Sequence, residues 1–288
     1  RTPLFLLAPL VAPSVPPTTT QRPSPLGYVC PRGAHRFQWV GSLVPEFGIS
    51  SSNVKILSTP TEFYQVMKAQ VKAAKRRITM ASLYLGTGPL EQELVDCIED
   101  ALCSTECEDL QVSILLDYTR GSRGKKNSRS MLLPLLRKYP DRVRVSLFHT
   151  PNLRGLLRAL TPERFNETIG LQHMKVYLFD DNVILSGANL SDSYFTNRQD
   201  RYILLQGCAQ LADFFSELVE AVGDVSLQLQ PDDSMEVEEG MEHPYQGEPS
   251  RQHFHSGLHG VRIFRKCGQT NMLKPHLRDD GPLAAVLS

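Results

Sequence analysis

Hydrophobic and polar positions follow two different periods along residues 54–223, which predicts strands separated by helices. Apolar runs typical of buried strands occur at 54–58, 78–86, 111–119, 143–150 and 200–206. Apolar residues three and four positions apart predict helices over 60–77, 89–103, 128–139 and 208–223. Buried strands that alternate with helices indicate an α/β fold, in which a parallel or mixed sheet carries helices on both faces.

The first predicted helix has the clearest start signal. Thr59 and Glu62 are spaced as in a capping box, and Pro60 stands at the first helical position. A helix is therefore expected to begin at Pro60.

Two segments lie outside the regular pattern. Residues 1–34 are rich in proline, and the chain has no acidic residue before Glu46, although arginines occur there. This composition fits the remnant of a mitochondrial transit peptide or a Pro-rich arm, and both interpretations stay open. Residues 231–288 begin acidic and then show no period, which predicts an irregular, disordered tail. One folded domain is expected over 35–230.

Composition excludes several classes of function. The 31 basic and 31 acidic residues cancel, which argues against a broad nucleic-acid surface and favours local basic clusters. The six cysteines form no CxxC pair and are interpreted as free thiols. The histidines near Cys267 match no common zinc spacing, so neither a metal nor another cofactor is expected. No run of 18 apolar residues occurs, so membrane contact is expected to be peripheral.

One apolar hairpin carries an unusual pair of polar residues, His173 and Lys175, within LQHMKVYLFDDNVILSGANLS. In an extended strand these two side chains would share one face, opposite Met174. A turn at Asp181-Asn182 would then place Asn189 opposite Met174, beside the pair. An imidazole, an ammonium and a carboxamide around small residues suit a phosphate group.

A phosphodiester repels nucleophiles, so catalysis needs cations and hydrogen-bond donors on its oxygens and a nucleophile in line. Lys175, Asn189 and Ser191 are candidates for the first task, and a neutral His173 for the second. Asp200 is the candidate that fixes the imidazole tautomer by hydrogen bonding to its far nitrogen. By strand parity Asp180 points away from the phosphate and is expected to hold the turn.

The string H-x-K-x4-D followed by SGAN resembles the HKD motif of the phospholipase D superfamily. The resemblance implies a phospholipase D-like α/β/α sandwich and a covalent phosphohistidine intermediate. It implies that His173 is the nucleophile, Lys175 the phosphate-binding residue and Asp180 the motif aspartate. The spacing to the small-residue segment is one residue shorter than usual, and Ser186-Gly187 replaces Gly-Ser.

A wider resemblance covers residues 35–245, through HRFQWVGSLVPEFGISSS, ASLYLGTGPLEQELVDC, LLDYTRGSRGKKNSR, the motif hairpin and AVGDVSLQLQ. These segments are similar to the N-terminal part of the mitochondrial phosphatidylglycerophosphate synthases. The resemblance implies transfer of a phosphatidyl group from CDP-diacylglycerol to glycerol 3-phosphate with release of CMP, in phosphatidylglycerol and cardiolipin biosynthesis. It also implies a place at the mitochondrial inner membrane.

The superfamily uses two HKD motifs, and this sequence has one, so it corresponds to a single half of the usual two-domain enzyme. Two hypotheses follow. Either two copies pair their motifs in a homodimer, or the chain is a catalytically incomplete half-domain that binds phosphate or anionic lipid. A nuclease activity is disfavoured by the zero net charge, and nucleic acid is not expected as a partner of this chain.

Basic residues also gather between a predicted strand and a predicted helix, where sheet folds often bind ligands. They are Arg120, Arg123, Lys125, Lys126 and Arg129. They are candidates for binding a substrate phosphate, the nucleotide or anionic lipid, and a merely solvated basic loop is the alternative. Leucines and arginines over 152–160 fit either an interfacial helix at an anionic membrane or a helix packed on the sheet.

Overall fold

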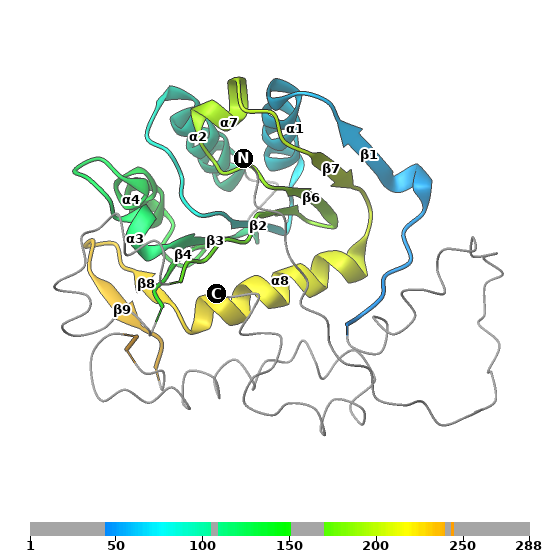
Figure 1. Cartoon of the computed structure of the whole chain (residues 1–288). Helices are drawn as coiled ribbons and strands as arrows, with labels where there is room; N and C mark the ends of the chain where they lie inside the picture. The colour runs from blue at the N-terminus through cyan, green and yellow to red at the C-terminus, as the bar shows by residue number, and fades with distance from the viewer. Residues whose placement is uncertain (1–43, 105–108, 151–169, 240–242, 245–288) are drawn as a thin grey trace, which may run out of the picture. The chain divides into compact units, whose positions relative to one another are not determined.

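The computed structural model describes residues 44–104, 109–150, 170–239 and 243–244 (Figure 1). The chain divides into two compact units, Arg1–Val44 and Pro45–Ser288, and the sheet and helices lie in the second. The predicted leader, the amphipathic segment 152–160 and the histidines near Cys267 lie outside the described residues.

One mixed sheet organises the described residues, with the strand order β1-β7-β6-β5-β2-β3-β4-β8-β9. Neighbours β2, β3 and β4 run parallel, and every other neighbouring pair is antiparallel. The strands are β1 (Val54–Leu57), β2 (Arg77–Ala81), β3 (Gln111–Asp117), β4 (Val143–Phe148), β5 (Val176–Phe179), β6 (Asn182–Ser186), β7 (Tyr202–Leu205), β8 (Leu227–Leu229) and β9 (Met235–Val237).

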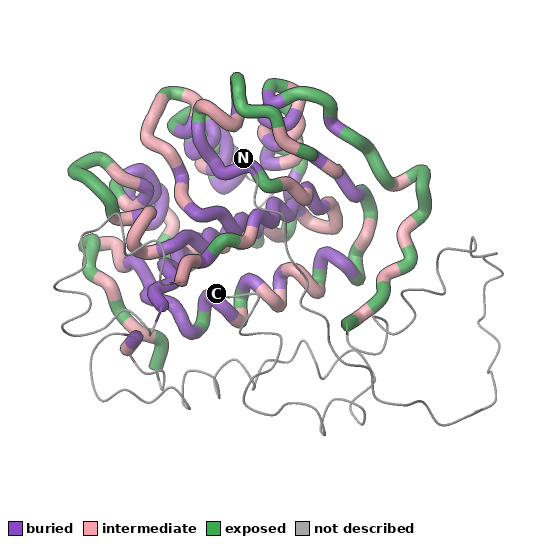
Figure 2. Tube along the Cα trace, in the orientation of Figure 1, coloured by how far each residue is buried: buried purple, intermediate pink, exposed green. Residues whose placement is uncertain are grey.

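Helices cover both faces of this sheet, which confirms the predicted sandwich (Figure 1). One face packs against α1 (Pro60–Ala73), α2 (Pro89–Cys103), α4 (Ser128–Lys138) and α7 (Asp192–Thr196). The other face packs against α8 (Ala209–Asp224). The first face encloses the larger hydrophobic core, and Figure 2 shows how buried positions concentrate where the helices meet the strands. The short helices are η3 (Ser51–Asn53) and α3 (Tyr118–Gly121).

The helix starts follow from local sequence. The hydroxyl of Thr59 accepts a hydrogen bond from the backbone N–H of Glu62 at 3.0 Å, and α1 begins at Pro60 as predicted. The carboxylate of Glu62 reaches back to the N–H of Ser58 at 2.8 Å. Asn127 caps α4 in the same way, through a capping box with Ser130.

Two predicted boundaries were wrong. β2 ends at Ala81 and not at residue 86, because the backbone N–H of Leu83 and of Gly86 turn to the segment Asn189–Leu190. The start of the expected irregular tail contains β9, which pairs with β8. Arg129 stabilises the connecting turn through an ion pair with Asp233 at 2.6 Å.

His173, Lys175 and Asn189 lie at one end of the strands, whereas Asp180 lies at the other. Because β2 and β3 are parallel and β5 is antiparallel to β2, the carboxyl ends of β2, β3 and β6 lie beside the amino end of β5. We call this the active-site edge. The segment 171–175 leads into β5 there, and 187–191 leaves β6 there.

Candidate active site

The segment that carries His173 and Lys175 is not a strand, contrary to prediction. β5 begins at Val176, and residues 171–175 have no regular structure. The ammonium of Lys175 donates a hydrogen bond to the carbonyl oxygen of His173 at 2.8 Å. Lys175 is 8% exposed, whereas His173 is among the exposed residues. The two residues therefore precede the strand, and the histidine is the more accessible of the two.

Burial changes the titration of both residues. Removal from water lowers the pKa of Lys175 to about 8, although the carboxylate of Asp200 partly offsets the effect. Partial burial also lowers the pKa of His173, and the neighbouring charge of Lys175 lowers it further. At neutral pH the imidazole is therefore uncharged, with a lone pair available for attack on an electrophile, while Lys175 remains mostly cationic.

Asn189 is held with its amide in a defined orientation. The carboxamide oxygen accepts hydrogen bonds from the N–H of Leu83 at 3.3 Å and from the hydroxyl of Ser82 at 3.5 Å. Asn189 is 5% exposed, and its amide nitrogen makes no hydrogen bond with another described residue. The arrangement leaves a donor for a ligand oxygen. The hydroxyl of Ser191 lies 3.2 Å from that of Tyr84, so Ser191 is already engaged.

The hairpin register differs from the predicted one. The turn lies at Asp180-Asp181, and Phe179 pairs with Asn182. This shifts the second strand by two residues relative to the expected turn at Asp181-Asn182. A shift of two keeps the same side chains on each face, so the predicted faces of β6 survive the error.

Asp180 lies at the far end of β5 from the active-site edge. Its carboxylate accepts hydrogen bonds from three successive backbone N–H groups, those of Lys75 at 2.9 Å, Arg76 at 2.8 Å and Arg77 at 3.1 Å. Its φ of 51° places it in the left-handed region, which a turn residue such as aspartate tolerates. This geometry fits the turn-holding role and not contact with a phosphate bound near Lys175.

Asp200 does not contact the imidazole of His173, contrary to prediction. One of its oxygens accepts from the N–H of Gly187 at 3.2 Å and from that of Arg201 at 2.6 Å, and no hydrogen bond joins it to His173. A Cβ on Gly187 would lie 2.7 Å from the other oxygen, so the approach requires glycine. Asp200 instead acts electrostatically on Lys175.

The basic segment separates into three parts. Arg120 lies in α3 and stacks over the ring of Tyr84 at 4.9 Å, which connects it to Ser191. Arg123, Lys125 and Lys126 are exposed in the following turn. Arg129 pairs with Asp233 through one guanidinium nitrogen at 2.6 Å, which directs it toward the turn before β9.

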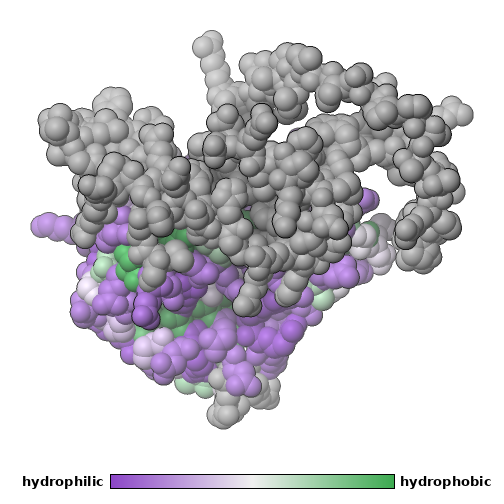
Figure 3. Space-filling model, turned by 90° about the horizontal axis from the view of Figure 1, so that it is seen from below, coloured by the Kyte–Doolittle hydropathy of each residue, from purple (hydrophilic) through white to green (hydrophobic). Residues whose placement is uncertain are grey.

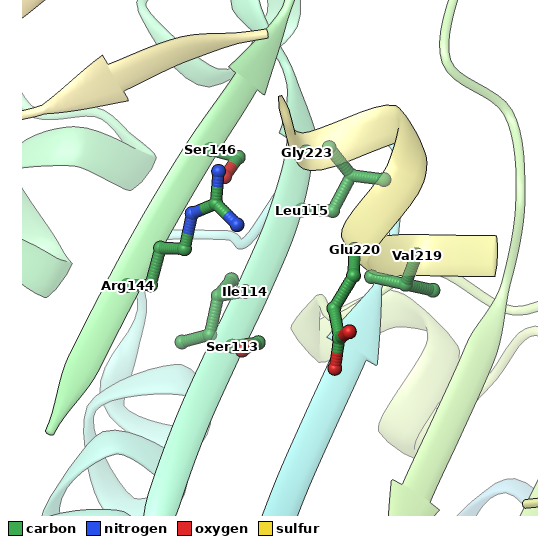
Figure 4. A pocket seen from close by; sticks show the side chains of 8 residues that line it. All are labelled: Ser113, Ile114, Leu115, Arg144, Ser146, Val219, Glu220 and Gly223. Carbon is green, nitrogen blue, oxygen red and sulfur yellow. The ribbon is translucent and has the colours of Figure 1, made fainter. Parts of the chain in front are cut away.

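A small pocket on the α8 side is not part of this site (Figure 4). It lies between β3, β4 and α8, and its volume of about 10 Å³ has room for roughly one water molecule. Arg144 lines it and pairs with Asp224 at 2.8 Å and Glu238 at 3.3 Å. The guanidinium of Arg144 is therefore already paired with carboxylates of the same chain.

Comparisons with known proteins agree with the geometry. No family model matches the sequence. The mitochondrial CDP-diacylglycerol–glycerol-3-phosphate 3-phosphatidyltransferase of Mus musculus is 71% identical over 252 residues, which cover 86% of this chain and 45% of the mouse protein. This chain belongs to the CDP-diacylglycerol–glycerol-3-phosphate 3-phosphatidyltransferase family. It spans about half the length of the curated relatives it matches.

Other members of the phosphatidyltransferase family are also similar. The Homo sapiens protein is 69% identical over 86% of this chain and 45% of its own length. The Schizosaccharomyces pombe protein is 47% identical over 61% of this chain and 34% of its own length.

Solved structures show a related fold. Phosphatidylserine synthase from Haemophilus influenzae has a TM-score of 0.53 at 22% identity, over 82% of this chain and 48% of that one. A phospholipase D family member, Nuc, from Salmonella typhimurium has a TM-score of 0.44 at 17% identity, over 62% of this chain and 97% of its own. The likeness to the phosphatidylserine synthase agrees with the predicted α/β/α fold, a mixed sheet with helices on both faces.

Sequence reasoning missed two buried residues of this family member's site, Asp117 and Gln172. Asp117 ends β3, and its carboxylate accepts from the N–H of Arg120 at 2.9 Å and from that of Gln172 at 3.3 Å. The side chain of Gln172 donates to the carbonyl of Leu115 at 3.4 Å. Asp117 therefore connects Arg120 of the basic segment to Gln172, the residue before His173. An acid after the apolar run of β3 was the available signal for Asp117, and Gln172 had none.

Proposed function

We propose that this chain supplies one half of a phosphatidyltransferase site, which acts on CDP-diacylglycerol and glycerol 3-phosphate. The observation that carries the proposal is a neutral, exposed His173 beside the buried ammonium of Lys175. The names of the full-length relatives support these substrates. An imidazole nucleophile next to a cation fits attack on an anionic phosphorus and needs no cofactor.

In the first step a ring nitrogen of His173 attacks the phosphatidyl phosphorus of CDP-diacylglycerol. A P–N bond forms, the phosphoanhydride P–O bond breaks, and CMP leaves with the electron pair. Lys175 and the amide N–H of Asn189 neutralise the charge that develops on the non-bridging oxygens. In the second step a hydroxyl oxygen of glycerol 3-phosphate attacks the same phosphorus, the P–N bond breaks and His173 is regenerated.

Both steps also need a group that protonates the leaving oxygen or accepts the proton of the attacking hydroxyl. The sequence carries one HKD motif, so this group comes from another polypeptide segment. Two arrangements fit this requirement. A second copy of the chain places its own motif opposite the first, or the additional length of the full-size relatives supplies it.

We also propose that Asp180 and Asp200 serve the site indirectly. Asp180 fixes the turn that aligns β5 with β2, and Asp200 keeps the pKa of Lys175 from falling further. Arg120 and the exposed Arg123, Lys125 and Lys126 remain candidates for binding the second phosphate or an anionic headgroup.

A mitochondrial, membrane-peripheral location is proposed for the active protein. The relatives from mouse and human are named as mitochondrial. Among the described residues, no helix is long and apolar enough to cross a bilayer.

A second candidate function follows from the single motif. The chain spans 45% of the mouse relative, and a half-domain without a proton donor would bind phosphate or anionic lipid without turnover. Such a half-domain would bind anionic vesicles through Arg123, Lys125 and Lys126, independently of His173.

The test is CMP release from CDP-diacylglycerol and glycerol 3-phosphate in mixed micelles, measured for the wild type and for His173→Ala over a range of protein concentrations. Release that disappears in His173→Ala and rises more steeply than linearly with concentration supports a two-copy site. Release unchanged by His173→Ala contradicts the proposed nucleophile. Absence of release from the wild type, with vesicle binding intact, supports the half-domain.

A further inference from the structure

The two faces of the sheet are covered unequally. Helix α8 packs mainly against β2 to β6 and β8, and less against the outer strands β7 and β1. On this side Val176, Leu185, Ile203 and Ile56 are direct partners across four neighbouring strands, so their side chains point to one face.

Exposure rises along this row. Val176 is 5% exposed, Leu185 and Ile203 are half-buried, and Ile56 is 64% exposed. In the next row Val54, at the same outer edge, is 38% exposed. Figure 3 views the described surface from this side, with hydrophobic and hydrophilic residues interspersed, and the strand register places the row on it. The outer part of this face is apolar without being covered by α8.

The row reaches the active-site edge at its buried end. Met174 is half-buried and packs against the same small core as Leu185. It stands between His173 and Lys175 in the chain, so an apolar strip, defined by Met174, Leu185, Ile203, Ile56 and Val54, runs from the catalytic segment to the outer strand.

We propose that this apolar strip docks on the acyl-chain region of a lipid bilayer and orients the active-site edge toward it. The inference rests on the proposed function. In CDP-diacylglycerol the reacting phosphorus is joined through a glycerol unit to two acyl chains, so a nucleophile that reaches it works at the bilayer surface. An apolar surface that begins beside the nucleophile is where the chains or the adjoining lipid would lie.

The charges of β1 agree with this orientation. Lys55 lies between Val54 and Ile56 and points to the opposite face of the strand, where it pairs with Glu62 at 3.5 Å. The contact is therefore expected to be mainly apolar, and it should persist on uncharged lipid.

The experiment is co-sedimentation of the full chain with phosphatidylcholine vesicles, repeated with vesicles that also contain phosphatidylglycerol. The variants are Ile56→Ser and the double variant Val54→Ser/Ile56→Ser, with Ile56→Leu as the conservative change. Val237→Ser is the matched control, because Val237 lies in the opposite edge strand and packs against the larger core on the other face.

Ile56→Ser is expected to lower the vesicle-bound to free ratio about tenfold on both lipids, as for one aliphatic side chain moved out of lipid. The double variant should lower it further, whereas Ile56→Leu and Val237→Ser keep wild-type binding. Thermal unfolding is recorded for each variant, and the high exposure of Ile56 predicts little change.

Vesicle binding that is unchanged in the double variant would overturn the proposal. So would a loss matched by loss of self-association without vesicles, because the strip would then bind a second copy. The measurement requires no turnover. If binding depends on Ile56 but CMP is never released, the docking surface stands and the transferase assignment fails.

Discussion

The two ends of β5 carry His173, Lys175 and Asp180, and the charged groups at these ends differ in how fully they are hydrogen-bonded. At one end the carboxylate of Asp180 accepts hydrogen bonds from three backbone N–H groups. At the other end Lys175 is buried with a single hydrogen bond to a carbonyl, and His173 is left exposed and neutral. A fully satisfied charge stabilises a fold, whereas an incompletely satisfied one is available to a ligand.

The largest effect is expected at the amino end of β5. Lys175→Met keeps the length of the side chain and removes the cation, so CMP release should fall about 10²- to 10³-fold, as when a key oxyanion donor is lost. Initial rates at saturating CDP-diacylglycerol give the measurement. Because an uncharged side chain suits a buried position, the urea midpoint should not fall, and a large fall would mean that the lysine is structural.

The opposite outcome is expected at the carboxyl end. Asp180→Ala leaves three backbone N–H groups without their acceptor, so the free energy of unfolding should fall by about 2–4 kcal/mol. Urea denaturation followed by circular dichroism measures it. CMP release per folded molecule should remain within a few-fold of wild type. A loss as large as that of Lys175→Met at unchanged stability would place Asp180 in the chemistry.

A smaller loss of CMP release is expected for a change at Gly187, which lies near the active-site edge. A Cβ there would meet the Asp200 carboxylate at 2.7 Å, so Gly187→Ala should displace Asp200 and slow CMP release about tenfold. Gly48→Ala is the matched control, because nothing lies within 4 Å of a Cβ at Gly48. Equal rates for the two variants would show that the contact between Gly187 and Asp200 is not needed.

The smallest effect concerns pH. The rate should rise as His173 loses its proton, at a pH below the usual histidine range, and fall as Lys175 loses its proton near pH 8. Asp200→Asn removes the carboxylate that raises the pKa of Lys175, so the alkaline fall should move to lower pH. The pH profile of kcat measures this, and a shift to higher pH or none would refute the assigned role of Asp200.

Sequence predicted the fold better than the site. The helix over 89–103 was predicted with its observed bounds, because Pro89 and a continuous apolar stripe are local signals. The mixed sheet with helices on both faces followed from the same periodicity. β9 was missed because three residues are too few to show a clear alternation within an acidic stretch, and the turn that leads to it depends on the distant Arg129.

At the site, rules based on neighbouring residues did not predict where the strand begins or which groups form hydrogen bonds. Strand parity placed His173 and Lys175 on one face, but the strand begins only after Lys175, where β6 first provides a partner. The contact of Asp117 with Gln172 joins residues 55 positions apart, and no periodicity encodes such a pair. The residue types of the site could be predicted, whereas their hydrogen-bond partners depend on the tertiary fold.

The most direct test of His173 as the nucleophile is a search for the covalent intermediate. The chain is incubated with CDP-diacylglycerol labelled in the phosphatidyl phosphate, without glycerol 3-phosphate, and peptides are mapped by mass spectrometry under alkaline conditions. Histidine attack predicts a phosphatidyl group on the peptide that contains His173, absent from His173→Gln and discharged when glycerol 3-phosphate is added. CMP release without this adduct, or the label on another residue, would contradict it.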